Sequence, residues 1–303
     1  MVITKKSKPP AKRWLVDASI YIFRAYFSLP PNWESRDGFD TEAVYGFTNF
    51  LLDLRIKQPS HVGVCFDEGL ETGFRHRLYP DYKASRALPD EALAYQLNAC
   101  RAMAEALGFA CFASEEYEAD DLIGCLLQCL VQEPAPVAIL TRDKDLGQLL
   151  VREQDYLWDY AADTTLYRPD IFEKFGVWPE QLVDYLALVG DASDDIPGVA
   201  GVGKKTAAQM LANNMALDTL LAEPAQFETM TFRGARSMAK KLAEYREQIA
   251  LAKQLAAIVS DVALVKSHQC LVPKPIDEVQ VAELLAFYGI GGLRKKLARA
   301  VGA

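Results

Sequence analysis

The chain has 303 residues, 50% of them apolar and 24% charged, and its formal net charge is −8 at pH 7. This length favours about two domains, and the composition excludes a chain that is disordered over most of its length. No apolar run approaches the roughly 18 residues that span a bilayer, and the charged N-terminal residues lack the apolar segment of a secretory signal, so we expect a cytoplasmic protein without membrane contact.

The first half of the chain alternates short apolar strands with amphipathic helices. A basic leader (residues 1–13) precedes an apolar strand that ends at Asp17, and a second apolar strand ends at Asp67. Further strands are predicted at 108–113 and 136–140, and helices at 41–56, 90–107 and 118–132. This alternation predicts an α/β fold with a parallel, doubly wound sheet, because parallel strands need crossover connections. Functional groups of such sheets gather beyond the carboxyl ends of the strands, so the acids there should meet in one cleft.

From about residue 178 the pattern is almost wholly helical. Helices are predicted at 182–190, 204–214, 237–258 and 282–301, with an irregular connection at 222–235. We therefore expect an α/β domain over residues 14–176 and a helical domain over residues 177–303.

The six cysteines form no Cys-x-x-Cys pair, and most lie in apolar runs. Cys125 and Cys129 could share a helix face, but a lone pair at that spacing is more typical of core packing than of a redox or metal site. We predict buried thiols without a chemical role.

Acidic residues concentrate at strand ends and helix starts. Like charges packed together raise one another's pKa, so a dense cluster of carboxylates requires cations. Oxygen ligands without paired histidines or thiolates select hard ions, and we expect two Mg²⁺ ions about 3.5 to 4 Å apart, with Mn²⁺ as a substitute, for phosphodiester hydrolysis. The candidate metal ligands are Asp17, Asp67, Glu118, Asp120, Asp121, Asp143, Asp145, Asp191 and Asp194.

The spacing of these acids suits a shared site. Glu118 and Asp121 are one helical turn apart, and Asp143 and Asp145 lie on one side of an extended strand end. Each acid taken alone could instead be a helix cap or a surface residue, and acids in the first turn of a helix are favoured by its dipole. A topoisomerase-primase type of metal site would use a glutamate with Asp-x-Asp, but it leaves four of the other aspartates without a role.

The segment IPGVAGVGKKTAAQML is glycine-rich and basic. A phosphate-binding P-loop needs Ser or Thr directly after its lysine, where Lys205 stands and Thr206 comes one place late. The spacing fits a hairpin between two helices, with an ordinary turn as the alternative. Glycine permits tight turning, and amides at the next helix start can face a phosphate, so we expect sequence-independent contacts to the nucleic-acid backbone. The candidate DNA-binding residues are Gly201, Gly203, Lys204, Lys205 and Thr206.

Six motifs occur in a fixed order over about residues 13 to 270: VDAS, VCFDEG, YKASR, YEADD, TRDKDL and GDASDDIPGVAGVGKKTA. Together they resemble the 5′-nuclease domain of bacterial DNA polymerase I and the wider flap endonuclease family. The resemblance implies a PIN-like nuclease core and a 5′ to 3′ exonuclease and flap endonuclease that cuts DNA at junctions of single strand and duplex, in replication or repair. The family's metal ligands fall on the nine acids named above.

The resemblance also implies roles for basic residues. Residues 73 to 107 would contain a helical arch over the active site, and we expect the segment 73–89 to be exposed. Lys83 and Arg86 would touch the scissile phosphate, where a cation offsets charge that develops in the transition state. The family's other invariant groups fall on Arg24, Arg75 and Tyr82.

The hairpin at residues 190–212 would be the family's helix-three-turn-helix (a helix-hairpin-helix), which holds the duplex and binds K⁺ through backbone carbonyls. One departure is Asp195, where relatives commonly have Asn. The chain ends at Ala303, so we expect no attached polymerase domain; a separate DNA polymerase is an expected partner of a monomeric nuclease.

The net charge of −8 fits a DNA partner if the acids lie in one pit and the bases form a separate track. The candidate track comprises Arg75, Arg77, Lys83, Arg86, Lys204, Lys205, Arg233, Arg236, Lys240 and Lys241. Two alternatives stay open from the sequence: a non-catalytic module that binds DNA junctions, and a related ribonuclease.

Overall fold

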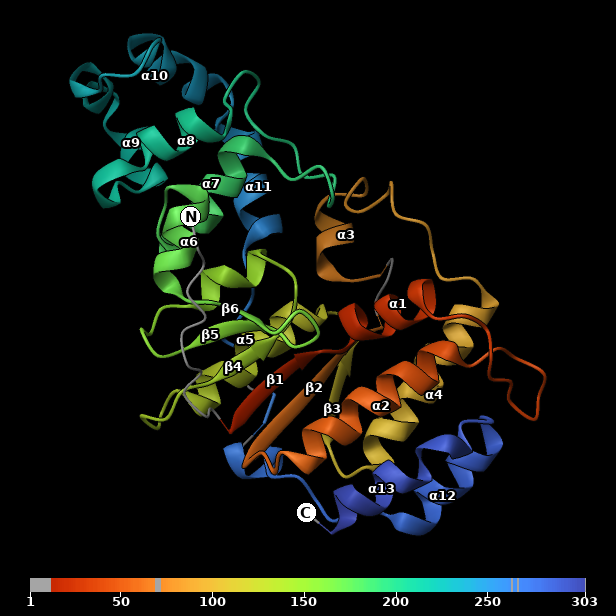
Figure 1. The fold of residues 1–303 in the computed structure, drawn as a ribbon. Helices are drawn as coiled ribbons and strands as arrows, with labels where there is room; N and C mark the ends of the chain where they lie inside the picture. The colour runs from red at the N-terminus through yellow and green to blue at the C-terminus, as the bar shows by residue number, and fades with distance from the viewer. Residues whose placement is uncertain (1–11, 69–71, 263, 266, 303) are drawn as a thin grey trace.

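The computed structural model describes residues 12–302, except for 69–71, 263 and 266 (Figure 1). The expected basic leader therefore lies outside the described residues apart from Lys12 and Arg13, and Arg13 already begins the first strand. The strands are β1 (Arg13–Asp17), β2 (His61–Asp67), β3 (Ala110–Ser114), β4 (Ala138–Leu140), β5 (Tyr156–Asp159) and β6 (Thr164–Leu166). The helices of this part are α1 (Ala18–Ser28), α2 (Glu42–Ile56), α3 (Phe74–Leu78), α4 (Glu91–Ala106), α5 (Ala119–Leu130) and α6 (Arg168–Phe175).

The sheet has the order β3-β2-β1-β4-β5-β6, and β1 to β5 are parallel. The antiparallel edge strand β6 departs from the expected all-parallel sheet. The connection from β5 to β6 spans only residues 160–163, which is too short for a parallel crossover. The strand order reverses between β1 and β4, which is where doubly wound sheets form their ligand crevice.

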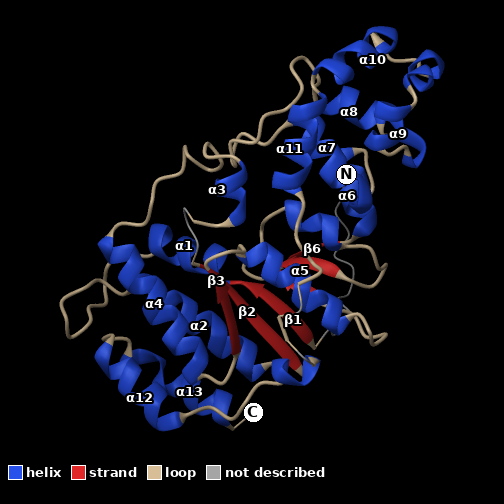
Figure 2. Cartoon of the chain, turned by 180° about the vertical axis from the view of Figure 1, so that it is seen from behind, coloured by secondary structure: helices blue, strands red, loops and turns tan. Residues whose placement is uncertain are grey.

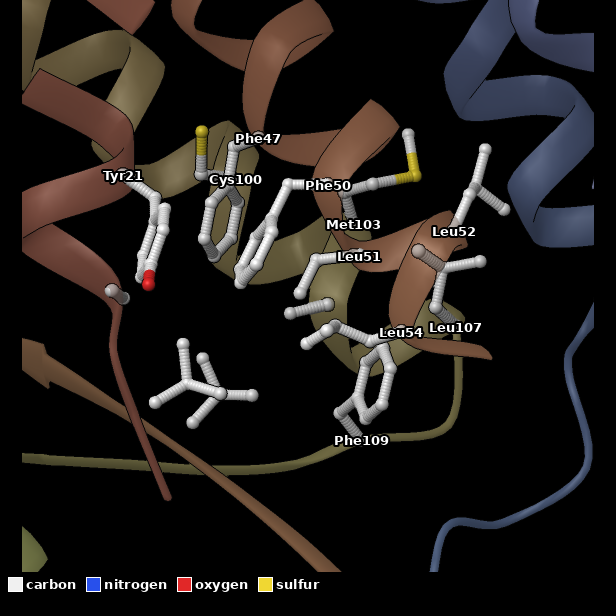
Figure 3. Close-up of a cluster of buried hydrophobic side chains, with 14 of the residues drawn as sticks. Tyr21, Phe47, Phe50, Leu51, Leu52, Leu54, Cys100, Met103, Leu107 and Phe109 are labelled. Atoms are coloured by element: carbon white, nitrogen blue, oxygen red, sulfur yellow. The ribbon is translucent and has the colours of Figure 1, made fainter. Parts of the chain in front are cut away.

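Side chains of β1 alternate between the two faces of the sheet, as a strand dictates. Trp14 and Val16 join a core with α1, α2 and α4, whereas Leu15 joins a second core with α5. Figure 3 shows part of the first core, where the rings of Tyr21 and Phe50 stack at a centroid distance of 4.1 Å. Helices thus cover both faces, and the backbone of β1 is held rigidly up to Asp17.

The helical part forms a separate core. Its helices are α7 (Leu182–Val189), α8 (Lys204–Met210), α9 (Leu217–Ala222), α10 (Ala235–Glu244) and α11 (Arg246–Ala256). The single helix expected at 237–258 is divided at Tyr245, whose backbone leaves the helical conformation. The break lets α10 pack on α9 while α11 packs on α7.

The C-terminal helices α12 (Glu278–Phe287) and α13 (Arg294–Val301) pack on α4 and α2 of the α/β part (Figures 1 and 2). Thr41 Oγ1 donates to the Tyr288 carbonyl at 2.7 Å, and Leu285 is buried in the first core. The expected helical domain of 177–303 is therefore wrong at its C-terminal end, because the apolar faces of these helices are covered by the α/β domain. None of the described helices combines the length and apolar character needed to cross a bilayer.

Candidate active site

Two aspartates end the central strands. Asp17 closes β1, where Thr141 Oγ1 donates to its Oδ2 at 2.9 Å. Burial and the charge of Asp67 raise the pKa of Asp17 to about 7. Asp67 closes β2 and accepts from Ser19 Oγ and from the Ala119 amide, each at 2.7 Å, so it joins the starts of α1 and α5 to the strand.

A second group of acids faces this pair. Burial and the charges of Asp17 and Asp143 raise the pKa of Asp120. Burial and the charge of Asp143 raise the pKa of Asp145 to about 7. Asp145 Oδ1 is buried without a hydrogen-bond donor, and Lys144 Nζ lies 3.9 Å from it. Raised carboxyl pKa values and an unpartnered buried oxygen both indicate negative charge that the chain does not neutralise.

Asp191 and Asp194 come from the loop after α7. Burial acts to raise the pKa of Asp191, but hydrogen bonds from the Ser193 hydroxyl and amide lower it overall. A hollow of about 30 Å³ brings these two acids together with others from the α/β domain. Its acidic lining consists of Glu118, Asp120, Asp143, Asp145, Asp191 and Asp194.

We call these six residues with Asp17 and Asp67 the acidic pit. As the side chains stand, no three metal-ligating groups among the described residues are arranged around one ion. Several of the carboxylates are instead held by hydrogen bonds of their own. The donor set still fits hard divalent cations, because it consists of oxygen atoms and includes the unpartnered Asp145 Oδ1.

Glu118 lies at the basic rim of the pit. Lys83 Nζ is 2.7 Å from its Oε1, and Tyr82 Oη donates to its Oε2 at 3.1 Å. Burial alone would raise the pKa of Glu118, but the charges of Lys83 and Arg75 lower it below its usual value. This acid is therefore compensated by the chain itself, in contrast to Asp120.

Asp121 does not line the hollow and is bound by Arg75, which does. The Arg75 guanidinium binds both carboxylate oxygens, at 2.6 and 2.8 Å, and also donates to the carbonyls of Leu255 and Ala257. Asp121 accepts two further bonds, from the amides of Glu118 and Val259. Four donors fill the four acceptor positions of a carboxylate, which leaves none for a cation.

The expectation of an exposed basic segment is wrong for Arg75, which is 4% exposed. Its guanidinium joins α3 to α5 and to the end of α11, so it ties the two domains together rather than facing solvent. Tyr82 is also buried and belongs to the core of the helical part.

The arch expected over 73–107 is smaller than predicted, because α4 packs into the first core and only the residues between α3 and α4 pass over the pit.

The residues that pass over the pit bind the loop that carries Asp191 and Asp194. We call residues 82–86 the strap. The Lys83 amide donates to the Asp194 carbonyl at 3.0 Å, and the guanidinium of Arg86, half exposed, binds the Asp194 carboxylate and the Ser193 carbonyl. Arg24 is not part of this contact: it lies 3.8 Å from Asp159 at the end of β5.

A larger cavity of about 510 Å³ opens beside the strap. Asp67, Glu118 and Lys83 line it, as do Phe23 and Phe27 of α1. Phe27 is 78% exposed, unusually high for an aromatic side chain. Neither phenylalanine was predicted from the sequence, although an aromatic side chain on a helix that starts after Asp17 was a usable signal.

The predicted hairpin continues along the chain from Asp191 and Asp194, the last two acids of the pit. Gly198 lies so close to Val189 that a Cβ atom would come within 2.3 Å of its carbonyl carbon, which fixes the tight return of the chain. Gly201 has a φ of +75°, and Lys204 and Lys205 are exposed at the start of α8. Thr206 is half-buried.

Two carbonyls of the hairpin already have partners. Gln248 Nε2 donates to the Gly198 carbonyl at 2.7 Å, and Lys241 Nζ donates to the Ala200 carbonyl at 2.8 Å.

Family models match most of the chain. The model "5'-3' exonuclease, N-terminal resolvase-like domain" covers residues 12–176, and the model "5'-3' exonuclease, C-terminal SAM fold" covers residues 177–279. The chain belongs to the 5′-3′ exonuclease family. This membership confirms the predicted family and the predicted order of an α/β nuclease domain and a helical domain.

Relatives include much longer proteins. DNA polymerase I of Pseudomonas aeruginosa is 41% identical over 277 residues, which are 90% of this chain and 30% of the relative. DNA polymerase I of Bacillus subtilis is 33% identical over 287 residues, 93% of this chain and 32% of the relative. The chain thus spans about a third of the length of these relatives and corresponds to their N-terminal 5′-nuclease region.

Solved structures share the fold. The exonuclease of phage T5 with bound zinc has a TM-score of 0.64 at 19% identity and covers 91% of this chain and 99% of its own. The catalytic core of Rad2 in complex with a DNA substrate has a TM-score of 0.62 at 14% identity and covers 96% and 91%. The fold of this chain is therefore one that in other proteins binds divalent metal ions and DNA.

The buried Arg75–Asp121 pair generates a stability prediction. Replacing Arg75 with Met leaves Asp121 as an uncompensated buried charge, and we expect the free energy of unfolding to fall by about 3 to 5 kcal/mol. The control is Arg77→Met, because the Arg77 side chain is 58% exposed and its ion pair with Glu116 lies at the surface, where such pairs contribute about 0 to 1 kcal/mol. Urea unfolding measures both, and equal effects of the two substitutions would contradict the assigned role.

Proposed function

We propose that this chain is a Mg²⁺-dependent 5′ nuclease that hydrolyses DNA phosphodiesters near junctions of single strand and duplex, as an exonuclease and flap endonuclease in replication or repair. The observation that carries the proposal is the acidic pit at the point where the strand order reverses, with raised pKa values at Asp17, Asp120 and Asp145. The family membership and the relatives' DNA polymerase I context support it.

The eight acids of the pit would hold two divalent ions. Asp17, Asp67, Glu118 and Asp120 would hold chiefly the first ion, and the acids of residues 143–145 and 191–194 would hold or frame the second. Such ions activate a water for attack on a phosphodiester and offset charge on the leaving oxygen. Asp121 was predicted as a metal ligand. Its carboxylate instead binds Arg75, and in this proposal it supports the site without contacting an ion.

The strap would supply the cations that receive the scissile phosphate. Lys83 and Arg86 contact Glu118 and Asp194 at the rim of the pit. A DNA phosphate arriving there offers these two side chains an anionic partner in the same place. Tyr82 sets the position of Lys83, because its ring is fixed in the helical core.

The cavity beside the strap suits an unpaired strand. Aromatic rings stack on bases without reading sequence, and the exposed ring of Phe27 lines the same cavity as Lys83 and Arg86. The hairpin with Lys204 and Lys205 would hold the duplex on the other side of the pit. Double-stranded and single-stranded DNA would then meet above the carboxylates, which accounts for cutting at junctions.

Three finer expectations stay predictions: a K⁺ ion at the hairpin, a monomeric state with a DNA polymerase as partner, and a cytoplasmic location. For K⁺, the carbonyls of Gly198 and Ala200 already accept side-chain donors.

Catalysis is tested at Asp120, whose half-buried side chain lies among other acids. We expect Asp120→Asn to reduce cleavage of a 5′-flap substrate by more than about 100-fold and to leave binding of the same DNA within about threefold, since one pit carboxylate is a small part of the contact. Asp37→Asn, at an exposed position, is the control. Full activity of Asp120→Asn in a gel assay with Mg²⁺ would contradict the assignment.

DNA binding is tested through its salt dependence. Each neutralised phosphate contributes about −0.9 to the slope of log K against log salt. We expect a steep slope for the unaltered chain, and a slope smaller in magnitude by roughly 1 to 2 for the double variant Lys204→Gln, Lys205→Gln. Fluorescence anisotropy with a labelled flap in Ca²⁺ measures this, and a slope near zero for the unaltered chain would contradict a basic track.

A further inference from the structure

The strap and the loop that carries Asp191 and Asp194 are bound face to face. Besides the contacts of Lys83 and Arg86, the Ser85 amide donates to Asp195 Oδ2 at 2.8 Å. Lys83 and Asp195 both have positive φ angles, +54° and +56°, so each segment turns sharply at the contact. Asp and Asn are the residues other than glycine that adopt this conformation most readily.

The loop holds Asp195 in a fixed place. The backbones of Asp191 and Ile196 exchange two hydrogen bonds, of 2.9 and 2.8 Å, which closes the loop around Asp195. Ile196 is buried in the helical core. Asp195 therefore presents its carboxylate from a rigid support.

The strap is held on both sides of Lys83. Tyr82 anchors it in the helical core on one side, and the Ser85 amide is bound to Asp195 on the other. Between these fixed points Lys83 Nζ reaches 2.7 Å from Glu118 Oε1. The Lys83 amide and the Arg86 guanidinium are bound to the same loop, and the Ser85 amide bond lies between them. Removing the acceptor at Asp195 would loosen the strap between these contacts and let the ammonium shift.

We propose that Asp195 is a positioning residue, which by binding the Ser85 amide holds the Lys83 ammonium over the carboxylates. The proposal rests on the proposed nuclease function. It predicts that the cleavage rate depends on a hydrogen-bond acceptor at residue 195 and not on the negative charge of the Asp195 side chain, because an Asn side chain offers the same acceptor oxygen.

The test compares two substitutions that both suit a positive φ. Asp195→Gly keeps the backbone conformation and removes the acceptor, and Asp195→Asn keeps the acceptor. We expect Asp195→Gly to lower the single-turnover cleavage rate of a 5′ flap about tenfold, since a small misplacement of a catalytic group costs up to about 100-fold, with the Kd for the flap in Ca²⁺ changed less than about threefold. Asp195→Asn should cleave at close to the original rate.

Two further measurements separate positioning from a general loss of structure. Hydrogen exchange of the peptide that contains Ser85 should be faster in Asp195→Gly than in Asp195→Asn. In a Lys83→Ala background, Asp195→Gly should cause no further loss of rate, because the two residues act through one group. Gln58→Gly is the control: it makes the same kind of change at an exposed positive-φ residue, at the amino-terminal side of β2.

The proposal is overturned if Asp195→Gly cleaves like the unaltered chain, if Asp195→Asn is as impaired as Asp195→Gly, or if the loss persists undiminished without Lys83. If the unaltered chain does not cleave the flap at all, the proposed function fails instead. In that case exchange of the Ser85 amide still decides whether Asp195 holds the strap.

Discussion

Electrostatic crowding at the carboxyl ends of β1 and β2 is the constraint on which the rest of the site depends. The sheet brings Asp17 and Asp67 to the same edge, because β1 and β2 are adjacent and parallel and Asp17 pairs with Cys65, two residues before Asp67. The start of α5 adds Asp120, and residues after β4 add Asp143 and Asp145. Burial removes the water that would otherwise screen these charges. The raised pKa values of Asp17, Asp120 and Asp145 are the consequence.

Basic side chains of this protein neutralise mainly the acids at the rim of the acidic pit. Lys83 and Arg86 compensate Glu118 and Asp194, and both bases come from a short strap whose position depends on the helical domain. Both domains therefore contribute to one site. The α/β domain supplies most of the carboxylates and the cations of the strap, and the loop after α7 in the helical domain supplies Asp191 and also Asp194, which binds the strap. Arg75 binds Asp121 and the end of α11, and so it links the α/β domain to the helical domain.

Local patterns in the sequence predicted much of this arrangement. The apolar runs that end in Asp17 and Asp67 identify two strands, and they place each acid at the carboxyl end of its strand. Both the strand conformation and the position of the acid depend on only a few neighbouring residues. The role of Arg75 could not be predicted, because its partners lie 46 and 180 positions away and an arginine in a basic segment looks like a surface residue.

Other features also depended on distant contacts. The pattern of α12 and α13 predicts helices with an apolar face but does not say which domain covers that face. The acceptor role of Asp195 depends on a strap residue 110 positions earlier. The antiparallel direction of β6 depends on a turn whose flanking strands, β5 and β6, were not recognised as strands from the sequence.

We propose that the carboxylates of the acidic pit are left uncompensated until divalent cations bind. This proposal is tested most directly by the melting temperature of the unaltered chain as Mg²⁺ is added at constant pH and ionic strength. A cation that binds only the folded chain stabilises it by about 2.7 kcal/mol at 100 times its Kd, and the stabilisation keeps growing with the logarithm of the cation concentration. We therefore expect the melting temperature to rise by several degrees, in proportion to the logarithm of the Mg²⁺ concentration once this exceeds the Kd. A melting temperature that does not change with Mg²⁺, or that rises equally when KCl replaces it, would contradict the account.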